Sequence, residues 1–194
     1  MKIIQPSLFP QTTDVKLFGF LIVITPSPEI VTYVNRLKSE FYQTYGKYRS
    51  MDSKPHISTC QFLMFDERQN NVLRSLQKSL SGISPFRLKL NGFGHFHGSN
   101  VIYLRVEQSE ELESLKKLFV YSLQRLWIEK NKIVVKNHHL TVAKDIHPGI
   151  FNSACDNYLP RSYQNSFMVD KLTVLRYAPY EVKYSKIMDL KLGK

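Results

Sequence analysis

The sequence predicts an α+β fold of two pseudo-symmetric lobes, each a mainly antiparallel sheet with outer helices. Short apolar runs rich in β-branched residues alternate with amphipathic stretches, in the order β-α-β-α-β and then β-α-β-α-β-β. The spacing also repeats, since His56 lies 39 positions after Leu17 and His139 lies 38 positions after Val101. We therefore expect one bilobal unit over residues 1–194.

The first strand and helix are the most clearly marked elements of the first half. Residues 17–25 are an apolar, β-branched run of strand length. Ser27 is typical of an N-cap, Pro28 suits the first helical position, and Gly46 ends the helical pattern. The apolar positions between them follow helical spacing: Ile30, Val31, Val34, Leu37 and Phe41.

Two more strands and one more helix complete the first half. A strand is expected over residues 56–64, after which Asp66 and Gln69 resemble a capping box that opens a helix. Residues 86–93 read as a third strand. The segment "GFGHFHGSN" that follows is rich in glycine and predicts a turn.

The second half repeats this order. A strand over residues 101–106 precedes a helix that Ser109 opens and that continues to about Glu129. The remaining expected elements are a strand over 139–143, a short helix over 148–160, and closing strands over 167–177 and 184–192.

The charge of the chain favours anionic partners. The formal net charge is +11 and the sequence pI is about 9.6, which suits nucleic acid, nucleotides or a phospholipid surface. A basic soluble protein with a solvated face is an equally good interpretation of charge alone. Cys60 and Cys155 are too few and too separated for a disulfide framework, so we expect a reducing compartment.

No segment predicts membrane insertion. The longest apolar stretch, residues 17–24, is far too short to span a bilayer, and the first ten residues contain no hydrophobic signal region. We therefore expect a cytoplasmic protein that does not bind membranes and is a monomer.

The pattern His-x-Ser/Thr occurs three times, at His56–Ser58, His139–Thr141 and His97–Ser99. One copy is a weak signal, because chance alone produces about one match in a chain of this composition. The first two copies open apolar strands at equivalent places in the repeat. In a strand, the ring and the hydroxyl at i and i+2 point to one face. The third copy lies in the glycine-rich segment, so we expect His97 to be a surface histidine.

Other interpretations of these residues remain open at this stage. A histidine on a half-buried strand is often only a satisfied core residue. The "HFH" segment at 95–97 could suggest a metal site, but no Cys/Asp/Glu cluster with ligand spacing accompanies it. His138 is expected to face the side of its strand opposite to His139. Phe93, Phe96 and Tyr103 could stack on a base, although packing in the core or in a loop is favoured for each.

The two strand motifs carry a family resemblance. "PHISTCQF" and "HHLTVAKD", whose histidines are 83 positions apart, resemble the paired signatures of the two-histidine (2H) phosphoesterases. The most similar group is the bacterial RNA 2′,3′-cyclic phosphodiesterases, also named 2′-5′ RNA ligases. The resemblance spans nearly the whole chain and includes "VIYLRV" and "KLTVLR". Ser58 stands where threonine is commoner in the family, and serine is an accepted alternative there.

The resemblance implies an active-site groove between the lobes and a role for each motif residue. His56 and His139 would be catalytic, and Ser58 and Thr141 would bind the phosphate. Lys144 lies where relatives often carry a cation near the phosphate, although a plain surface lysine is as good an interpretation. The implied enzyme opens 2′,3′-cyclic or 2′-5′ phosphodiesters of RNA or nucleotides, with ligation as the reverse reaction, and it needs no metal or cofactor.

The chemistry explains why two histidines are needed. A water molecule must lose a proton as it attacks phosphorus, and the departing ribose oxygen must gain one. Histidine suits both tasks because its unperturbed pKa lies near neutrality. The sequence does not say which histidine is the base. Two other classes stay open: a module that binds RNA ends or nucleotides without turnover, and a metal-dependent hydrolase.

Overall fold

The computed structural model describes residues 16–128, 132–178 and 184–193. Four helices are present in these segments: α1 (Pro28–Tyr45), α2 (Gln69–Leu80), α3 (Glu110–Arg125) and α4 (Pro148–Tyr158). The strands are β1 (Leu17–Ile24), β2 (Ile57–Phe65), β3 (Phe86–Phe96), β4 (Val101–Val106), β5 (Ile133–Val134), β6 (His139–Ala143), β7 (Gln164–Val169), β8 (Lys171–Tyr177) and β9 (Ser185–Lys191). Short 3-10 turns lie at Asp66–Arg68 and His97–Ser99.

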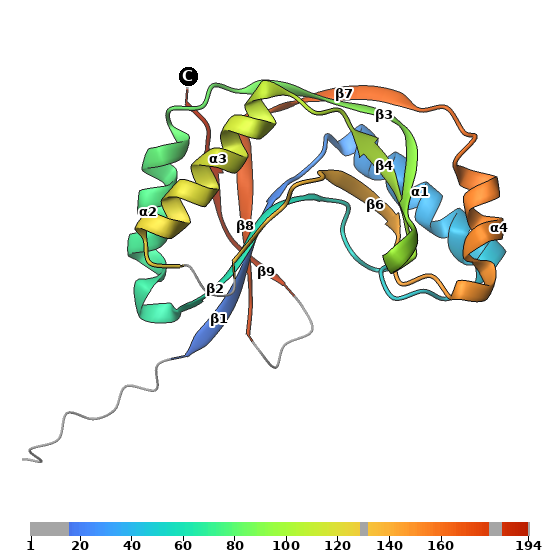
Figure 1. Ribbon diagram of the computed structural model, residues 1–194, viewed down its shortest axis with the longest axis horizontal. Coiled ribbons are helices and arrows are strands. Elements are labelled where there is room, and N and C mark those ends of the chain that lie inside the picture. The colour runs from blue at the N-terminus through green and yellow to red at the C-terminus, as the bar shows by residue number, and fades with distance from the viewer. Residues whose placement is uncertain (1–15, 129–131, 179–183, 194) are drawn as a thin grey trace, which may run out of the picture.

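The strands form a nine-stranded antiparallel sheet that curls into an open half-barrel (Figure 1). Its order is β7-β3-β4-β6-β2-β1-β8-β9, and β5 pairs with β2 beside this path. The order is symmetric about its centre: β6 and β2 meet there, β4 and β1 flank them, and β3 and β8 come next. The α+β class and the two pseudo-symmetric lobes predicted from the sequence are therefore confirmed.

The two halves of the chain exchange strands between the lobes, which the sequence does not predict. One lobe contains β1, β2, β8 and β9, and the other contains β3, β4, β6 and β7. Strand β3 belongs to the first half of the chain but pairs with β4 and β7, whereas β8 pairs with β1. Each lobe is therefore completed by strands from the other half.

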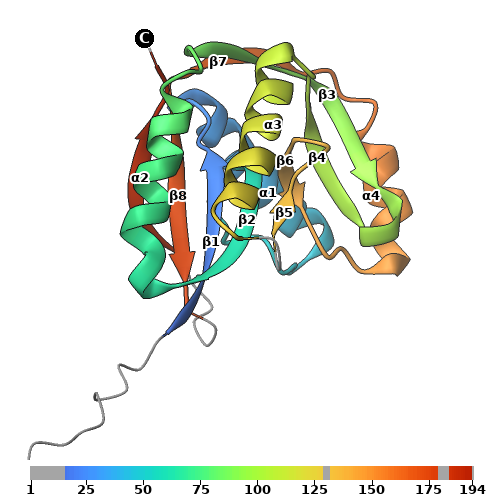
Figure 2. The same cartoon turned by 60° about the vertical axis from the view of Figure 1, so that its left-hand side comes forward.

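The helices lie in two pairs on the outer side of the curled sheet, as Figures 1 and 2 show. Helices α1 and α4 lie together, and Tyr45 and Tyr158 donate hydrogen bonds across them to the carbonyl oxygens of Ser153 and Leu37. Helices α2 and α3 lie together on the other lobe, where the Ser122 hydroxyl donates to that of Ser79. This arrangement leaves the inner face of the central strands without a helix.

The outer face of the sheet forms the hydrophobic core. In the two central strands, Ile57 and Leu140 are fully buried beneath the helices, together with Phe62 and Val142. The flanking residues of the same strands, His56 and Ser58 on one and His139 and Thr141 on the other, are only partly buried. Alternation along both strands therefore turns the motif residues toward the inner face.

The prediction of a turn over the glycine-rich segment is wrong for most of its length. Strand β3 continues to Phe96, because Gly94, His95 and Phe96 pair with the three residues Tyr103, Ile102 and Val101 of β4. The turn is confined to the residues from His97 to Asn100, and Asn100 adopts a left-handed conformation. Glycine is tolerated inside this strand because the Tyr103 ring covers Gly94, as described below.

Some predicted boundaries also shift. The expected strand over 167–177 is two strands separated at Asp170, where the chain passes from one lobe to the other. Asp66 caps no α-helix, since it opens a 3-10 turn and α2 begins at Gln69. Ser109 does cap α3, its hydroxyl accepting from the Leu112 amide at 3.3 Å. That helix ends at Arg125, and the expected end at Glu129 lies outside the described residues.

None of the described helices is long and apolar enough to cross a membrane.

Candidate active site

The two histidine motifs lie at the starts of the two central strands and face one another across the strand pair, with His56 directly before β2 and His139 as the first residue of β6. Strands β2 and β6 are antiparallel, with Ile57 opposite Leu140. This register places Ser58 opposite His139 and Thr141 opposite His56. Directly opposed residues have Cβ atoms about 4.5–5.5 Å apart. The structure therefore brings all four predicted motif residues to one place on the inner face.

A β-bulge follows the hydroxyl residue in both motifs. In β2, Ser58 and Cys60 pair with consecutive residues of β1, so Thr59 is the extra residue. In β6, Thr141 and Ala143 pair with consecutive residues of β4, so Val142 is the extra residue. Bulges bend a strand and change the direction of nearby side chains. The two motifs therefore have the same local backbone irregularity at equivalent positions, one in each lobe.

Each imidazole is held by the same kind of hydrogen bond. His56 Nδ1 lies 2.8 Å from the carbonyl oxygen of Lys54, and His139 Nδ1 lies 2.9 Å from that of Asn137. A carbonyl oxygen can only accept, so both Nδ1 atoms carry a proton. In the neutral ring the lone pair is therefore on Nε2. Within the part of the chain that the structure describes, neither Nε2 has a hydrogen-bond partner, so each can take or give a proton.

The surroundings favour the neutral form of His56. Burial is the main cause that lowers its pKa below the usual 6.5, and the hydrogen bond to the Lys54 carbonyl opposes this. The positive charges of Lys38 and of protonated His139 lower the pKa further. Protonation of His139 therefore disfavours protonation of His56.

His139 is perturbed in the same direction. Burial lowers its pKa, the hydrogen bond to Asn137 raises it, and the nearby Lys144 ammonium lowers it. Lys144 is exposed, and its backbone N–H donates to the Ser50 hydroxyl at 2.9 Å. The predicted Lys144 is thus near the histidine of its own motif, with its side chain in solvent.

An aromatic wall stands beside His139. The Tyr103 ring centroid lies 5.1 Å from that of His139, and the Phe96 centroid lies 4.9 Å from it at an interplanar angle of 86°. The sequence favours packing in the core or in a loop for both aromatics, and this interpretation is corrected, since both are only partly buried and lie next to the motif. Phe93 is a core residue, as expected.

Tyr103 is set in place by a glycine on the next strand. Tyr103 pairs with Thr141 on one side and with Gly94 on the other. A Cβ atom on Gly94 would lie 2.7 Å from the Tyr103 ring. The other lobe contains a similar arrangement, in which a Cβ on Gly19 would collide with the ring of Tyr177. In each lobe, a tyrosine ring therefore covers a glycine on the neighbouring strand.

Lys38 is a feature near the site that the sequence analysis missed. This α1 residue is only 4% exposed, and its ammonium donates to the carbonyl oxygen of Ser50 at 3.0 Å and to the hydroxyl of Ser53 at 2.8 Å. Burial lowers its pKa to about 8. Its position in the helical pattern of α1 is that of an inward residue, which was the signal available.

Two further histidines, His97 and His138, are not part of the paired motifs. His97 is exposed, in the 3-10 turn after β3. His138 is buried and directly precedes β6, and among the described residues its Nδ1 has no hydrogen-bond partner. Within residues 16–128, 132–178 and 184–193, no three His, Cys, Asp or Glu side chains are grouped so that they could hold a metal ion.

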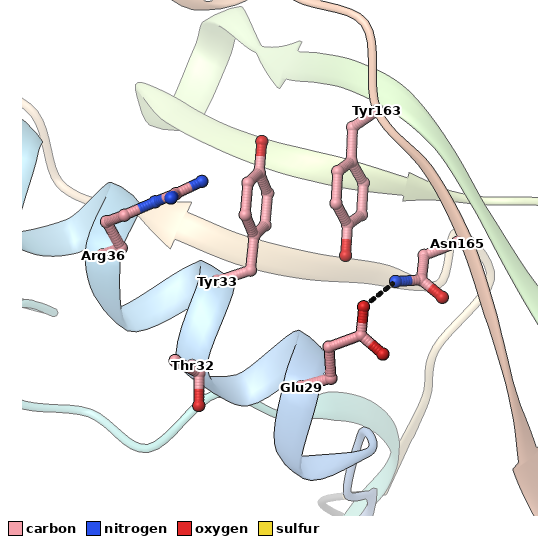
Figure 3. A pocket seen from close by; sticks show the side chains of 6 residues that line it. All are labelled: Glu29, Thr32, Tyr33, Arg36, Tyr163 and Asn165. Atoms are coloured by element: carbon pink, nitrogen blue, oxygen red, sulfur yellow. Dashed lines mark hydrogen bonds between the residues drawn. The ribbon is translucent and has the colours of Figure 1, made fainter.

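A separate cavity of about 220 Å³ lies between α1 and the chain leading into β7 (Figure 3). The rings of Tyr33 and Tyr163 stack there at 4.2 Å, and the Arg36 guanidinium lies 5.1 Å from the centre of the Tyr33 ring. Glu29 accepts a hydrogen bond from Asn165 at 3.3 Å. These contacts fasten α1 to the edge of the second lobe, and neither motif lines the cavity.

The arrangement has the parts that acid–base chemistry at phosphorus needs. Two imidazoles each present a free Nε2, and two hydroxyls lie directly opposite them across the strand pair. Hydroxyls can donate to the non-bridging oxygens of a phosphate, where charge grows in the transition state.

Comparison with known proteins agrees with this picture. The family model described as "2'-5' RNA ligase superfamily" matches residues 26–181, which include both motifs. The chain belongs to the 2′-5′ RNA ligase superfamily. The chain is also similar in sequence to a protein of Staphylococcus aureus (strain Newman) named "Putative phosphoesterase". The two are 22% identical over 174 residues, which cover 89% of this chain and 98% of the relative.

Several solved structures share the fold. Escherichia coli LigT in its apo form has a TM-score of 0.70 at 15% identity, covering 92% of this chain and 99% of LigT. LigT complexed with 3′-AMP has a TM-score of 0.64 at 16% identity, with coverage of 91% and 99%. The protein TT0787 of Thermus thermophilus has a TM-score of 0.66 at 15% identity, with coverage of 91% and 99%. At these identities the likeness shows the fold alone.

Proposed function

We propose that this member of the superfamily is a metal-independent phosphodiesterase that opens 2′,3′-cyclic or 2′-5′ phosphodiesters of RNA or nucleotides. The observation that carries the proposal is the matched pair of imidazoles on adjacent central strands. Each has Nδ1 bonded to a backbone carbonyl and Nε2 free. Such a pair is suited to a reaction in which one proton is removed while another is supplied.

The proposed reaction on a cyclic phosphate uses one neutral and one protonated histidine. The Nε2 lone pair of the neutral ring takes a proton from water as the water oxygen bonds to phosphorus. The Nε2–H of the other ring gives its proton to the ribose oxygen as the P–O bond breaks. The product is a phosphomonoester, and the histidine pair has again one proton. Ligation would use the same proton transfers with a ribose 5′-hydroxyl in place of water. That oxygen would lose its proton to the neutral ring and bond to phosphorus as the P–O bond to the 3′ oxygen breaks and the other ring protonates that oxygen, which leaves a 2′-5′ linkage. This is the reverse of cleaving a 2′-5′ phosphodiester into a cyclic phosphate and a 5′-hydroxyl.

Ser58 and Thr141 are proposed to bind the phosphate. Each hydroxyl lies opposite the histidine of the other motif, so a phosphate between the two rings would be within reach of both hydroxyls. Hydrogen bonds to the non-bridging oxygens stabilise the charge that develops there. Lys144 is proposed to assist through the field of its exposed ammonium, which attracts an anionic substrate.

The class of substrate is supported by charge and by the family. The net charge of +11 favours an anionic ligand. LigT, which shares the fold, has been crystallised with 3′-AMP. A ribonucleotide with a phosphate at its 2′ or 3′ position is therefore the proposed ligand of this site as well.

The test is a product assay on a panel of 2′,3′-cyclic nucleotides and on a short RNA ending in a 2′,3′-cyclic phosphate, with and without EDTA. His56→Asn and His139→Asn remove Nε2 but keep a donor near the backbone carbonyl. We expect each to lower kcat by about 10²–10⁴-fold, with RNA binding retained and EDTA without effect. His97→Asn is the matched control and should retain full activity.

Three results would contradict the proposal. Inhibition by EDTA that a divalent cation reverses would indicate a metal-dependent hydrolase. Full activity in both histidine variants would place the chemistry elsewhere. RNA binding by the native protein without turnover of any cyclic phosphate would indicate a binding module.

A further inference from the structure

The loop between α1 and β2, residues 46–56, connects the two histidine motifs. It contains no helix or strand, yet it supplies the carbonyl oxygen of Lys54 that binds His56 Nδ1. Its Ser50 hydroxyl accepts from the backbone N–H of Lys144, just past the end of β6. A loop without regular structure therefore orients one histidine and contacts the strand of the other.

Lys38 is the side chain that holds this loop. Its ammonium donates three hydrogen bonds, to the carbonyl oxygens of Ser50 and Ser53 and to the Ser53 hydroxyl. The Ser53 hydroxyl in turn donates to the Ser50 carbonyl at 2.7 Å. All three ammonium protons are satisfied by the loop, and the peptide group that is bound at Ser53 directly precedes Lys54.

A tyrosine extends this network to the other motif. The buried Tyr48 hydroxyl lies 3.3 Å from the carbonyl oxygen of Lys38 and 3.4 Å from that of Val142. Val142 is the bulged residue that follows Thr141. Through this one hydroxyl the loop contacts both α1 and the irregular part of β6.

We infer that Lys38 is a positioning residue for the proposed reaction, holding the 46–56 loop so that the Lys54 carbonyl keeps His56 Nε2 directed at the substrate. A buried lysine is costly to maintain, because removing a charge from water is unfavourable unless it is well bonded. Methionine or leucine would fill the same volume in the core of α1. Packing alone does not explain why a charged residue occupies this position. The three hydrogen bonds, all to one loop, do explain it. This inference rests on the proposed function.

The charge of Lys38 also makes the two histidines unequal. The groups that act on His56 are Lys38 from α1, His139 from β6 and the carbonyl of Lys54 from its own loop. His139 is acted on by Lys144, whose exposed charge is screened by solvent, whereas the buried charge of Lys38 is not. The two histidines therefore differ in their charged neighbours, since a buried cation acts on His56 and an exposed one on His139.

The test combines ¹⁵N NMR of the histidine rings with kinetics, so that it does not depend on turnover alone. Lys38→Met removes the charge and the donors, Lys38→Gln keeps two donors without the charge, and exposed Lys47→Met is the control. In the native protein His56 should be the Nδ1–H tautomer. Its ring signals should show a second inflection near pH 8, where Lys38 titrates, and those of His139 should show none. Signals are assigned with the His56→Asn and His139→Asn variants.

In Lys38→Met we expect a mixed tautomer at His56 and at least a tenfold fall in kcat, with KM changed less than threefold. Lys38→Gln should recover the tautomer, and Lys47→Met should match the native protein. The inference is overturned if His56 lacks the Nδ1–H tautomer in the native protein, or if Lys38→Met leaves tautomer and kcat unchanged. If Lys38→Met does not fold, the inference is tested by the NMR titration of the histidine rings in the native protein and by the tautomer and kcat of Lys38→Gln. A changed tautomer in a protein that turns over no cyclic phosphate would instead refute the proposed function and leave the positioning role intact.

Discussion

Each candidate catalytic histidine has one nitrogen engaged with the backbone and the other free, in an environment that disfavours the charged ring. For both, burial is the main cause of a lowered pKa, and neighbouring cations act in the same direction. For His56, one of these cations is the protonated ring of His139. The consequences for pH dependence can be tested separately in activity and in stability.

The pH profile of kcat/KM should be bell-shaped, with its maximum below pH 6.5. The active form carries one proton on the pair, and both pKa values lie below the ordinary value of 6.5. Lys144→Gln removes a positive charge near His139, so its pKa rises and the alkaline limb should move to higher pH. Lys78→Gln on the exposed face of α2 is the control. A maximum above pH 7.5, or no shift in Lys144→Gln, would contradict this prediction.

His138 should make the fold sensitive to acid. Burial lowers its pKa below 6.5, so the folded state holds it neutral while the unfolded chain takes up a proton as pH falls. Its contribution to stability is present above pH 6.5 and lost below it. His138→Leu should reduce the fall in Tm between pH 7 and pH 5. Because it also removes an unpaired buried nitrogen, worth about 1–3 kcal/mol, it should not destabilise the protein at pH 7. A Tm lowered at pH 7 would argue against it.

The sequence was sufficient to find the four motif residues, but not the groups that tune them. A histidine and a hydroxyl at i and i+2 share a strand face whatever the rest of the fold does, so local spacing is informative. Lys38 and Tyr103 reach the site through a loop and through a neighbouring strand. Their roles depend on tertiary contacts, and nothing in the spacing of either residue from the motifs distinguishes it from an ordinary helix or strand residue.

At the level of the elements, the bulges and the glycines shape the inner face. The bulged residues Thr59 and Val142 occupy equivalent places after the two motifs. The Thr59 hydroxyl donates to the Ile22 carbonyl at 2.8 Å, within the irregular part of the β1–β2 pairing. The glycine-rich segment was mistaken for a turn because glycine usually marks one. Here Gly94 instead gives room to the aromatic ring on the next strand.

Gly94→Ala should impair activity more than Gly19→Ala does. Both substitutions force a tyrosine ring to move, and both should lower Tm. Only the ring beside Gly94, that of Tyr103, contacts His139, so only Gly94→Ala should raise KM or lower kcat, by about tenfold. The comparison uses steady-state kinetics and thermal unfolding of the two variants. Equal kinetic loss in both would show that the Tyr103 contact is not used.

For the whole molecule, the decisive feature is the exchange of strands between the lobes. The repeat in spacing predicted two similar halves, and this is confirmed in the symmetric strand order. Spacing could not show that β3 completes the second lobe or that β8 and β9 complete the first, because pairing between distant strands leaves no local pattern. The break at Asp170 was missed because apolar residues lie close to it on both sides, at Phe167–Val169 and at Leu172, so the local pattern resembles one continuous strand.

Neither half of the chain should fold alone. Fragments 1–98 and 99–194 each lack strands that complete their lobe, so both should show unfolded ¹H spectra. The full chain should unfold in urea in one transition, at the same midpoint by circular dichroism and by loss of activity. A fragment with dispersed methyl and amide signals, or two separate midpoints, would indicate lobes that are independent.

The same exchange has a consequence during synthesis. Strand β1 leaves the ribosome long before its partner on one side, β8, which begins only at Lys171. Until β8 has been synthesised, that edge of β1 offers unpaired amide and carbonyl groups beside apolar side chains, which is the kind of edge on which nascent chains aggregate. Production of this protein should accordingly benefit from slow translation or from chaperones that shield the growing chain, and truncation near the C-terminus should be more harmful to solubility than its distance from the histidines suggests.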